Sequence, residues 1–341
     1  MTGSSCHDWT GFTLRTMPAL RTMPALRAMP ALGALQAFGA VLALGAMVPL
    51  GADACPLARI GGWGSFGSAQ GQFNFAHHLA VDPASGDVYV GDLLNHRVQH
   101  FGADGAFLGQ WARPGVDAVA VGPDGSIYVT GNDSVTRHTA TGNLLDTWGS
   151  TGSDPGQFRF PIDVAVDAQG LVYVADLQNH RLQKFTATGS FLEQWPTSDS
   201  GPISVAISPT GEVYTTDVTR NEVQVFTSNG APVRSWGVFG TGDGEFDSPG
   251  KVGFDAAGNV LVPDGGNGRV QVYTPTGGFL CGWGSQGSGT EQLFHLTAVG
   301  ARLERVYVMD KDNHRVVVLE NPPLALTPYS WSSVKNLYRA P

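Results

Sequence analysis

The sequence predicts an all-β fold, a six-bladed β-propeller built from four-stranded antiparallel blades. Three observations support it: a recurring tryptophan, four short strand-like runs in each repeat, and a strand that is missing from the last repeat but present ahead of the first. A Trp ends a short apolar run six times, at spacings of 37 to 48 residues (Trp63, Trp111, Trp148, Trp195, Trp236 and Trp283).

Each repeat contains four short runs of alternating or β-branched residues, which are typical of short strands. In the third repeat these runs are residues 161–167, 171–176, 181–185 and 189–195. Gly, Asp, Asn and Pro separate the runs, and these are the residues that tight turns require. No segment between Gly61 and Glu320 fits a helix of ten residues. The pattern therefore indicates one four-stranded blade in each repeat.

The two ends of the repeat region complete each other. The last repeat has three runs but no fourth strand ending in Trp-Gly, whereas residues 59–64 (RIGGWG) supply such a strand before the first repeat. A propeller removes its exposed edges by closing into a ring. We therefore expect residues 59–64 to pair beside residues 315–320 and close the last blade.

Residues 1–54 have the pattern of a targeting segment. Arg15, Arg21 and Arg27 precede an uncharged stretch, and residues 52–54 (ADA) have the small-x-small form of a cleavage site. The sequence thus predicts a secreted or periplasmic protein, with a propeller at residues 55–320 and a tail at 321–341. The alternative is an uncleaved membrane anchor, because the apolar core at 31–48 is just long enough to span a bilayer.

Charge and cysteine content narrow the classes of partner. The formal net charge of −9 argues against nucleic acid, whose phosphates require a basic face. Without the targeting segment two cysteines remain, Cys55 and Cys281; they could form one disulfide, and separate thiols are the slightly favoured interpretation, with lipidation of Cys55 left open. We expect a monomer whose partner is a protein, peptide or glycan held by the loops.

A recurring triplet identifies the repeat. Asn-His-Arg stands at residues 95–97, 179–181 and 313–315, and Asn-Gly-Arg at 267–269. These triplets and their spacing resemble the NHL-repeat family over roughly residues 58–320. The resemblance implies a six-bladed propeller and says little about function, because one fold serves many activities.

An Asp precedes each of these four Arg residues by five positions, at the end of the second strand of its blade. A hairpin brings the two together, so we expect a structural, bidentate ion pair in each of four blades. The pairs are Asp92/Arg97, Asp176/Arg181, Asp264/Arg269 and Asp310/Arg315. The second repeat lacks both charges, and the fourth keeps Asp217 but has Glu222 opposite, with Arg220 available to compensate.

The mouth of the central channel is the expected place for chemistry, because the residue ahead of each inner strand lies there. Aligning the repeats puts His77, Asp117 and His295 at this level in three consecutive blades. Two His and one carboxylate could bind a divalent metal, Zn or Ca, with open positions. His78 and Asp163, one residue further along, could contribute instead. The alternative is a wet channel mouth lined by polar residues.

The segment 75–80 (FAHHLA) is similar to an inner-strand motif of peptidyl-hydroxyglycine amidating lyase, another six-bladed propeller of this kind. The resemblance implies a zinc held by histidines at the mouth, with His77 at a matching position and His295 as a second match. In that family three histidines occupy alternate blades. Here the two lie in neighbouring blades, and Ile162 and Gly250 take the other places, so the ligand set is incomplete.

The sequence therefore favours an exported, non-catalytic scaffold that binds a protein or glycan. The alternative is a metal-dependent lyase or hydrolase with its site at the channel mouth. RNA binding, which occurs among NHL proteins of the tripartite-motif type, fits an acidic exported chain poorly.

Overall fold

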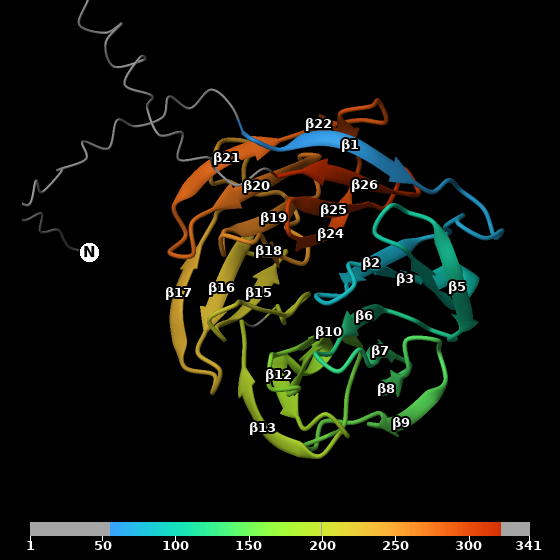
Figure 1. Cartoon of the computed structure of the whole chain (residues 1–341). Coiled ribbons are helices and arrows are strands. Elements are labelled where there is room, and N and C mark those ends of the chain that lie inside the picture. The colour runs from blue at the N-terminus through green and yellow to red at the C-terminus, as the bar shows by residue number, and fades with distance from the viewer. Residues whose placement is uncertain (1–54, 199, 322–341) are drawn as a thin grey trace, which may run out of the picture. The chain divides into compact units, whose positions relative to one another are not determined.

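The computed structural model describes residues 55–198 and 200–321. Six four-stranded antiparallel sheets stand around a common centre, which confirms the predicted six-bladed propeller (Figure 1). The predicted targeting segment, residues 1–54, and the tail at 322–341 lie outside the described residues. The helices of the described residues are two single 3₁₀ turns, η1 (Leu93–Asn95) and η2 (Leu177–Asn179). None of the described residues forms a helix long and apolar enough to cross a membrane.

The blades follow one another along the chain, and within each blade the first strand is innermost (Figure 1). Blade one is β2 (Ala76–Val81), β3 (Val88–Asp92), β4 (Arg97–Phe101) and β5 (Phe107–Ala112); blade two is β6 (Ala118–Val121), β7 (Ile127–Gly131), β8 (Ser134–His138) and β9 (Leu144–Trp148); blade three is β10 (Pro161–Val166), β11 (Val172–Asp176), β12 (Arg181–Phe185) and β13 (Phe191–Pro196). Blade four is β14 (Ala206–Ile207), β15 (Val213–Asp217), β16 (Glu222–Phe226) and β17 (Pro232–Trp236); blade five is β18 (Gly253–Phe254), β19 (Val260–Asp264), β20 (Arg269–Tyr273) and β21 (Phe279–Trp283); blade six is β24 (Leu296–Arg302), β25 (Arg305–Asp310), β26 (Arg315–Glu320) and β1 (Ala58–Trp63).

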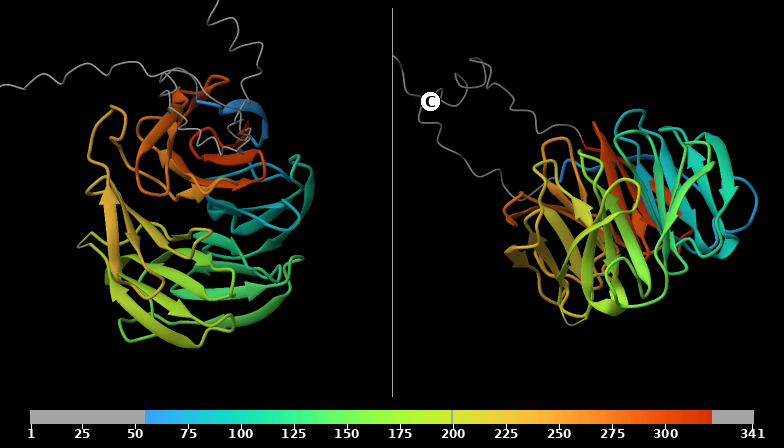
Figure 2. Two further views of the ribbon diagram at one scale, coloured as in Figure 1. Left: turned by 60° about the vertical axis from the view of Figure 1, so that its left-hand side comes forward. Right: turned by 90° about the horizontal axis from the view of Figure 1, so that it is seen from below.

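The ring closes as predicted, with the first strand of the chain completing the last blade. β1 pairs antiparallel with β26, with Gly62 opposite Val317 and Trp63 opposite Val316. In Figure 2 the blue β1 lies against the red strands of blade six. Every blade thus has four strands, and the pairing covers the edge that β26 would otherwise expose.

The core lies between the blades. Six clusters of buried apolar side chains each join two neighbouring blades. The repeated Trp packs at these junctions: the Trp63 ring lies so close to Gly105, in a turn of blade one, that a Cβ on this glycine would come within 2.6 Å of it. The six tryptophans therefore hold adjacent blades together.

The favoured interpretation of Cys55 and Cys281 as separate thiols was wrong. The two residues form a disulfide, with Cα atoms 5.1 Å apart. Cys55 lies just ahead of β1, and Cys281 lies on β21, the outer strand of blade five. The two are separated by 226 residues in sequence, yet ring closure places β1 in blade six, beside blade five. The disulfide therefore ties the closing strand to the adjoining blade.

Long connectors lead into the inner strands of blades one, three, five and six. The last of these contains a small parallel sheet of β22 (Ser285–Gln286) and β23 (Gln292–Leu293). Phe73 and Phe158 are fully buried and anchor their connectors; Phe246 and Leu293 do the same in blades five and six. The connectors into blades two and four are short and lack this anchor.

Candidate functional site

The four Asp–Arg pairs form, and they hold the long connectors in place. Each Arg Nε donates to Oδ2 of its Asp at 2.7–2.8 Å. The pairs are not bidentate as predicted, because the remaining guanidinium nitrogens turn to the connector: Arg97 donates to the backbone oxygens of Ser68, Ala69 and Gln72, each at 2.8 Å. The ion pair is thus one end of a clamp on the connector backbone.

The two blades without the pair solve the problem differently. In blade two the arrangement is reversed, because the Arg belongs to the connector. Arg113 of the short connector donates to Thr136 Oγ1 and Gly131 O of the blade, each at 3.1 Å. In blade four, the Ser198 and Ser200 hydroxyls donate to Asp217. Arg220 approaches Asp217 only to 4.0 Å, so it compensates weakly.

The strand register corrects the predicted alignment of the channel mouth. A bulge in β2 places Ala76 opposite Asp92 and His78 opposite Gly91. In blade six Leu296 lies opposite Asp310 and Ala298 opposite Met309. His77 therefore corresponds to Thr297, whereas His295 corresponds to Phe75. Both His295 and Phe75 have positive φ, 58° and 61°.

Within the described residues no three His, Cys, Asp or Glu side chains converge as a metal site requires, so the predicted set of His77, His295 and Asp117 is not assembled. Asp117 faces Arg113 and Asp133, and burial raises its pKa to about 6. His295 Nδ1 contacts Asp312 Oδ2 at 3.1 Å. The donor set therefore does not fit a zinc or calcium ion.

A buried polar cluster lies one residue further in, where three alternate blades direct polar side chains toward the axis. Lys251 Nζ donates to Asp163 Oδ1 at 2.7 Å and to Val164 O at 2.9 Å. Asp163 Oδ2 accepts a bond from Val205 N at 2.7 Å, and His78 Nδ1 lies 3.6 Å from Asp163 Oδ1. At the position where a metal site would need a third ligand beside His78 and Asp163, this cluster has the ammonium group of Lys251.

His77 and His78 are neutral at ordinary pH. Burial lowers the pKa of each to about 3. Repulsion adds to this, at His77 from His78 once it is protonated and from Lys311, and at His78 from Lys251. His77 Nε2 is buried without a hydrogen-bond partner among the described residues. The His77 ring stacks 4.7 Å from Phe75, and Lys311 Nζ lies 4.5 Å from the Phe75 ring centre.

The pKa of His77 predicts a pH dependence of stability. His77 binds a proton below about pH 6.5 in the unfolded chain but only near pH 3 in the folded protein. The free energy of unfolding therefore falls as the pH is lowered through this window. Between pH 6.5 and 4 we expect the free energy of unfolding to fall by about 2 kcal/mol more for the wild type than for His77→Asn. Urea unfolding at the two pH values measures this difference. The matched control His96→Asn, at an exposed corner, should follow the wild type; equal pH slopes for His77→Asn and wild type would contradict the prediction.

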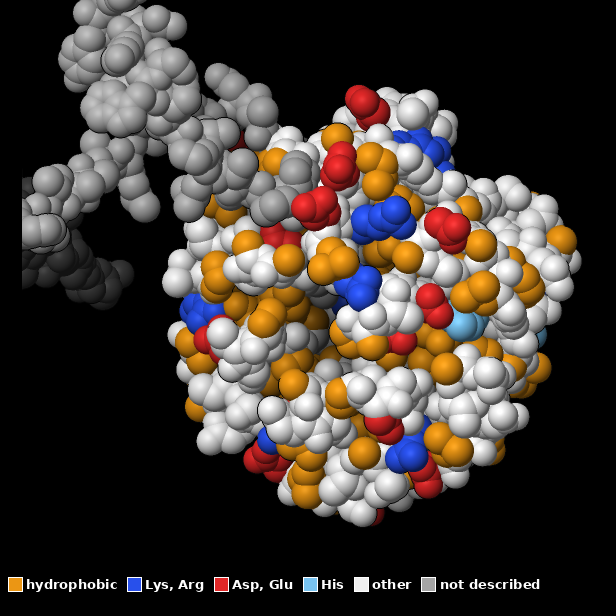
Figure 3. Space-filling model, in the orientation of Figure 1, with side chains coloured by type: hydrophobic (Ala, Val, Ile, Leu, Met, Phe, Trp, Pro, Cys, Tyr) orange, Lys and Arg blue, Asp and Glu red, His pale blue; other side chains and the backbone are white. Residues whose placement is uncertain are grey.

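Exposed apolar side chains gather at the mouth. Connectors and the corners between second and third strands lie at the same end of the blades, because the strands alternate in direction. Of the 17 large exposed hydrophobic residues among those described, eight lie at this end, eight lie on the outer strands of the blades, and one, Leu303, lies in the hairpins of the other end. The eight are Phe66, Phe75, Leu94, Phe160, Val218, Val238, Phe239 and Phe294. Figure 3 shows one face of the molecule, on which hydrophobic and charged side chains are interspersed.

Backbone strain accompanies this exposure. Phe75 and Phe160 have φ of 61° and 56°, a left-handed conformation that is rare for bulky residues. Their side chains are nonetheless 37% and 42% exposed. Strained residues that hold apolar side chains in water are typical of ligand-contacting sites.

Fold and clamps together define a class: a six-bladed propeller of four-stranded repeats with an Asn-x-Arg corner. The model of the NHL repeat matches residues 73–101, 158–185 and 200–226, in blades one, three and four. The chain therefore carries NHL repeats in a six-bladed β-propeller.

Curated relatives match parts of the chain. Peptidyl-glycine alpha-amidating monooxygenase B of Xenopus laevis is 32% identical over 149 residues, which is 37% of this chain and 17% of that protein. The E3 ubiquitin-protein ligase TRIM32 of Homo sapiens is 45% identical over 58 residues, 17% of this chain and 9% of that protein. The chain thus spans less than a fifth of the length of these relatives.

Solved structures share the fold at low sequence identity. A protein of unknown function from Bacteroides thetaiotaomicron has a TM-score of 0.63 at 16% identity and covers 77% of this chain and 75% of its own. Virginiamycin B lyase from Staphylococcus aureus has a TM-score of 0.54 at 12% identity, covering 77% of this chain and 98% of its own. At these identities the likeness concerns the fold.

Sequence reasoning missed two residues of this region. Lys251 follows Pro249-Gly250 in a segment that reads as a turn, and a single Lys there resembles an ordinary surface charge. Only its position in the repeat could have revealed Lys251. It is equivalent to His78 and Asp163 once the blades are aligned on the strand register. Lys311 directly follows the second strand of blade six and had no such signal.

Proposed function

We propose that this propeller is a non-catalytic binding scaffold that holds a protein or glycan partner on its mouth face. The observation that carries the proposal is the gathering of exposed aromatic side chains there, with Phe75 and Phe160 held out by a left-handed backbone. Aromatic side chains are enriched in binding interfaces because they bury much area with few rotatable bonds.

The likeness to amidating monooxygenases and to virginiamycin B lyase supports a second candidate, a lyase or hydrolase at the mouth. One further observation favours it: the buried, unpartnered His77 Nε2. The side chains around His77 argue against it, because Lys311 adds a positive charge and the third donor of a metal site is missing. The scaffold is therefore the better-supported function.

Export remains part of the proposal. It rests on the sequence of residues 1–54 and is supported by the disulfide between Cys55 and Cys281, since such bonds form in oxidising compartments.

Purified protein should bind members of a glycan array or a peptide array, and the double variant Phe75→Asp/Phe160→Asp should weaken that binding about tenfold or more, since buried aromatic anchors dominate interfaces. The matched control Leu108→Asp/Leu144→Asp alters exposed residues on outer strands and should bind as the wild type does.

Two results would contradict the scaffold. One is equal loss of binding in the two double variants. The other is turnover of hydroxyglycine peptides, lactones or esters that His77→Ala abolishes, which would establish the second candidate.

A further inference from the structure

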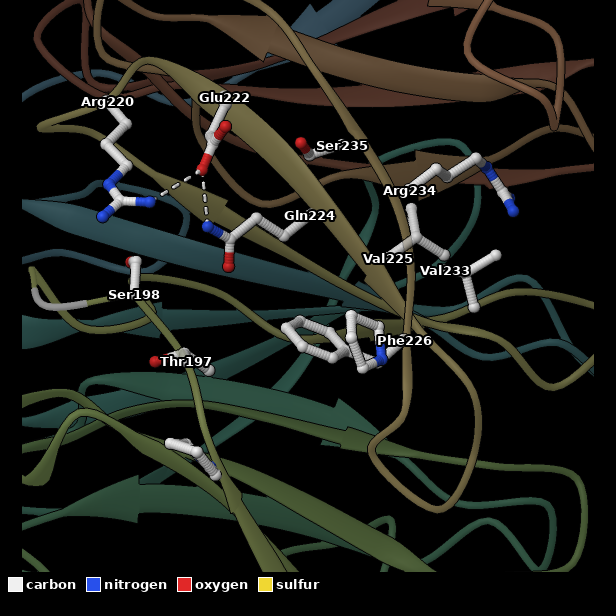
Figure 4. A pocket seen from close by; sticks show the side chains of 12 residues that line it. Thr197, Ser198, Arg220, Glu222, Gln224, Val225, Phe226, Val233, Arg234 and Ser235 are labelled. Atoms are coloured by element: carbon white, nitrogen blue, oxygen red, sulfur yellow. Dashed lines mark hydrogen bonds and ion pairs between the residues drawn. The ribbon is translucent and has the colours of Figure 1, made fainter.

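A cavity of about 550 Å³ opens between blades three and four (Figure 4). One wall is residues 196–198, where the chain leaves β13, and the other is formed by β16 and β17. Glu222, Gln224 and Phe226 of β16 line it side by side, with Ser235 of β17 beyond them. Arg220 stands at its rim, 53% exposed and 3.8 Å from Glu222.

In the sister blades the same surface is covered by the chain's own connector. Gly71 N donates to Gln99 Oε1 at 2.9 Å, and Gln99 Nε2 donates to Gln72 O at 2.8 Å. One glutamine side chain thus pairs with a backbone N–H and a backbone C=O of a turn, whose glycine has a positive φ of 74° at Gly71. Blade three repeats this with Gly156, Gln183 and Gln157, and blade five with Gly244, Gln271 and Glu245.

The residue after this backbone pair is an apolar anchor. The buried Phe73 packs 5.8 Å from Phe101, and Phe158 packs 5.6 Å from Phe185. The bound segment therefore reads Gly-Xaa-Phe in blades one, three and five, at residues 71–73, 156–158 and 244–246.

Blade four keeps the receiving surface but has lost the cover. Gln224 and Phe226 stand where Gln99 and Phe101 stand in blade one, by the register of their strands. The connector into blade four is short and contains no Gly-Xaa-Phe. Among the described residues the Gln224 side chain makes a single hydrogen bond, from Nε2 to Glu222 Oε1 at 2.6 Å.

We propose that this cavity, the blade-four slot, binds a Gly-Xaa-Phe-like turn of a partner protein, which takes the place of the missing connector. Gln224 receives the backbone N–H of the glycine and the C=O of the next residue. Phe226, which packs in the cluster between blades three and four, forms the apolar floor for the aromatic side chain. Such pairing of a ligand backbone with a fixed polar array is a general mode of peptide recognition.

The exchange of Arg for Glu sets the strength of this site. In the sisters the Arg at the position of Glu222 donates to two or three connector carbonyls. Glu222 cannot donate, so the slot holds its segment through Gln224 and the apolar floor and releases it readily. The slot is distinct from the aromatic mouth, and neither proposal depends on the other.

The probe for the test is the chain's own connector as a free peptide, GSDPGQFRF, which is the sequence of residues 152–160. Titrated into ¹⁵N-labelled full-length protein, it should give saturable shifts at blade four. Gln224→Ala should weaken binding about tenfold through loss of two backbone hydrogen bonds, and Glu222→Arg should strengthen it about fivefold by restoring the donors.

Matched controls separate the slot from the general surface. Gln178→Ala, at the exposed η2 corner, should bind the peptide as the wild type does, and the peptide with Phe replaced by Ala should lose most of its affinity. The peptide control carries the test if Gln224→Ala does not fold. No saturable binding to the wild type, or equal affinity for the two peptides, would overturn the proposal.

Discussion

Replacing Lys251 with methionine is expected to lower the free energy of unfolding by about 3–5 kcal/mol, because it leaves a buried carboxylate without its partner. Asp163 is fully buried, and the Lys251 side chain is the cation that contacts it, at 2.7 Å. Burial raises the pKa of Asp163, and the Lys251 ammonium opposes that rise. Urea unfolding at pH 7 measures the loss.

Two further variants show whether the lost partner is the cause. Lys184→Met also breaks an ion pair, but Glu193 opposite is partly exposed and stays hydrated, so the loss should stay near 1 kcal/mol. Adding Asp163→Asn to Lys251→Met should recover most of the stability, since the amide can still accept the bond from Val205 N. A Lys251→Met variant no less stable than Lys184→Met would refute this account of the cluster.

Cys55→Ser is expected to lower the free energy of unfolding by about 2–5 kcal/mol, which is usual for a disulfide that closes a long loop. The bond joins residues 226 apart in sequence and holds β1 against blade five. Its loss frees the start of the closing strand, whose pairing with β26 completes the ring. Calorimetry of oxidised protein measures the fall in Tm.

The disulfide also predicts a pattern across variants. Cys55→Ser, Cys281→Ser and the double variant should unfold at the same temperature, because each removes the same bond. Dithiothreitol should lower the Tm of the wild type to that value and leave the variants unchanged. A wild type indifferent to reductant would show that the bond contributes nothing to stability.

The fold could be predicted because the signal was repeated six times. Each blade carries its own strands, turns and Trp, so an error in one repeat is outweighed by the other five. The closing strand followed from the same logic, since residues 59–64 matched the part that the last repeat lacked. Phe73 and Phe158 were predictable for the same reason, because their Gly-Gln-Phe context recurs.

The site could not be predicted in the same way, because it depends on register. His295 was placed level with His77 by aligning the repeats on their inner strands. The true reference point is the buried anchor of the connector, and in blade six this anchor is Leu293 rather than Phe. A shift of two positions along one strand removed a histidine from the inferred metal site.

The disulfide was missed for a geometric reason. Cys55 precedes β1 and Cys281 lies on β21 of blade five, and only ring closure, which places β1 in blade six, brings the two together. The spacing of two cysteines along the sequence does not show that they lie close in space. The pairing of β1 with β26 could be predicted because residues 59–64 have the pattern of the strand that the last repeat lacks.

The pairing of β1 with β26 also sets an order of assembly during synthesis. β1 leaves the ribosome first among the propeller strands, but its partner residues, Val316 to Glu320, are made last. Until then β26 does not exist, so the earliest strand waits unpaired while five complete blades form behind it. Strand pairings between residues this distant in sequence slow folding, and until β26 is made the backbone hydrogen-bonding groups of β1 stay unpaired. The nascent chain is therefore most vulnerable to aggregation just before its final blade is finished.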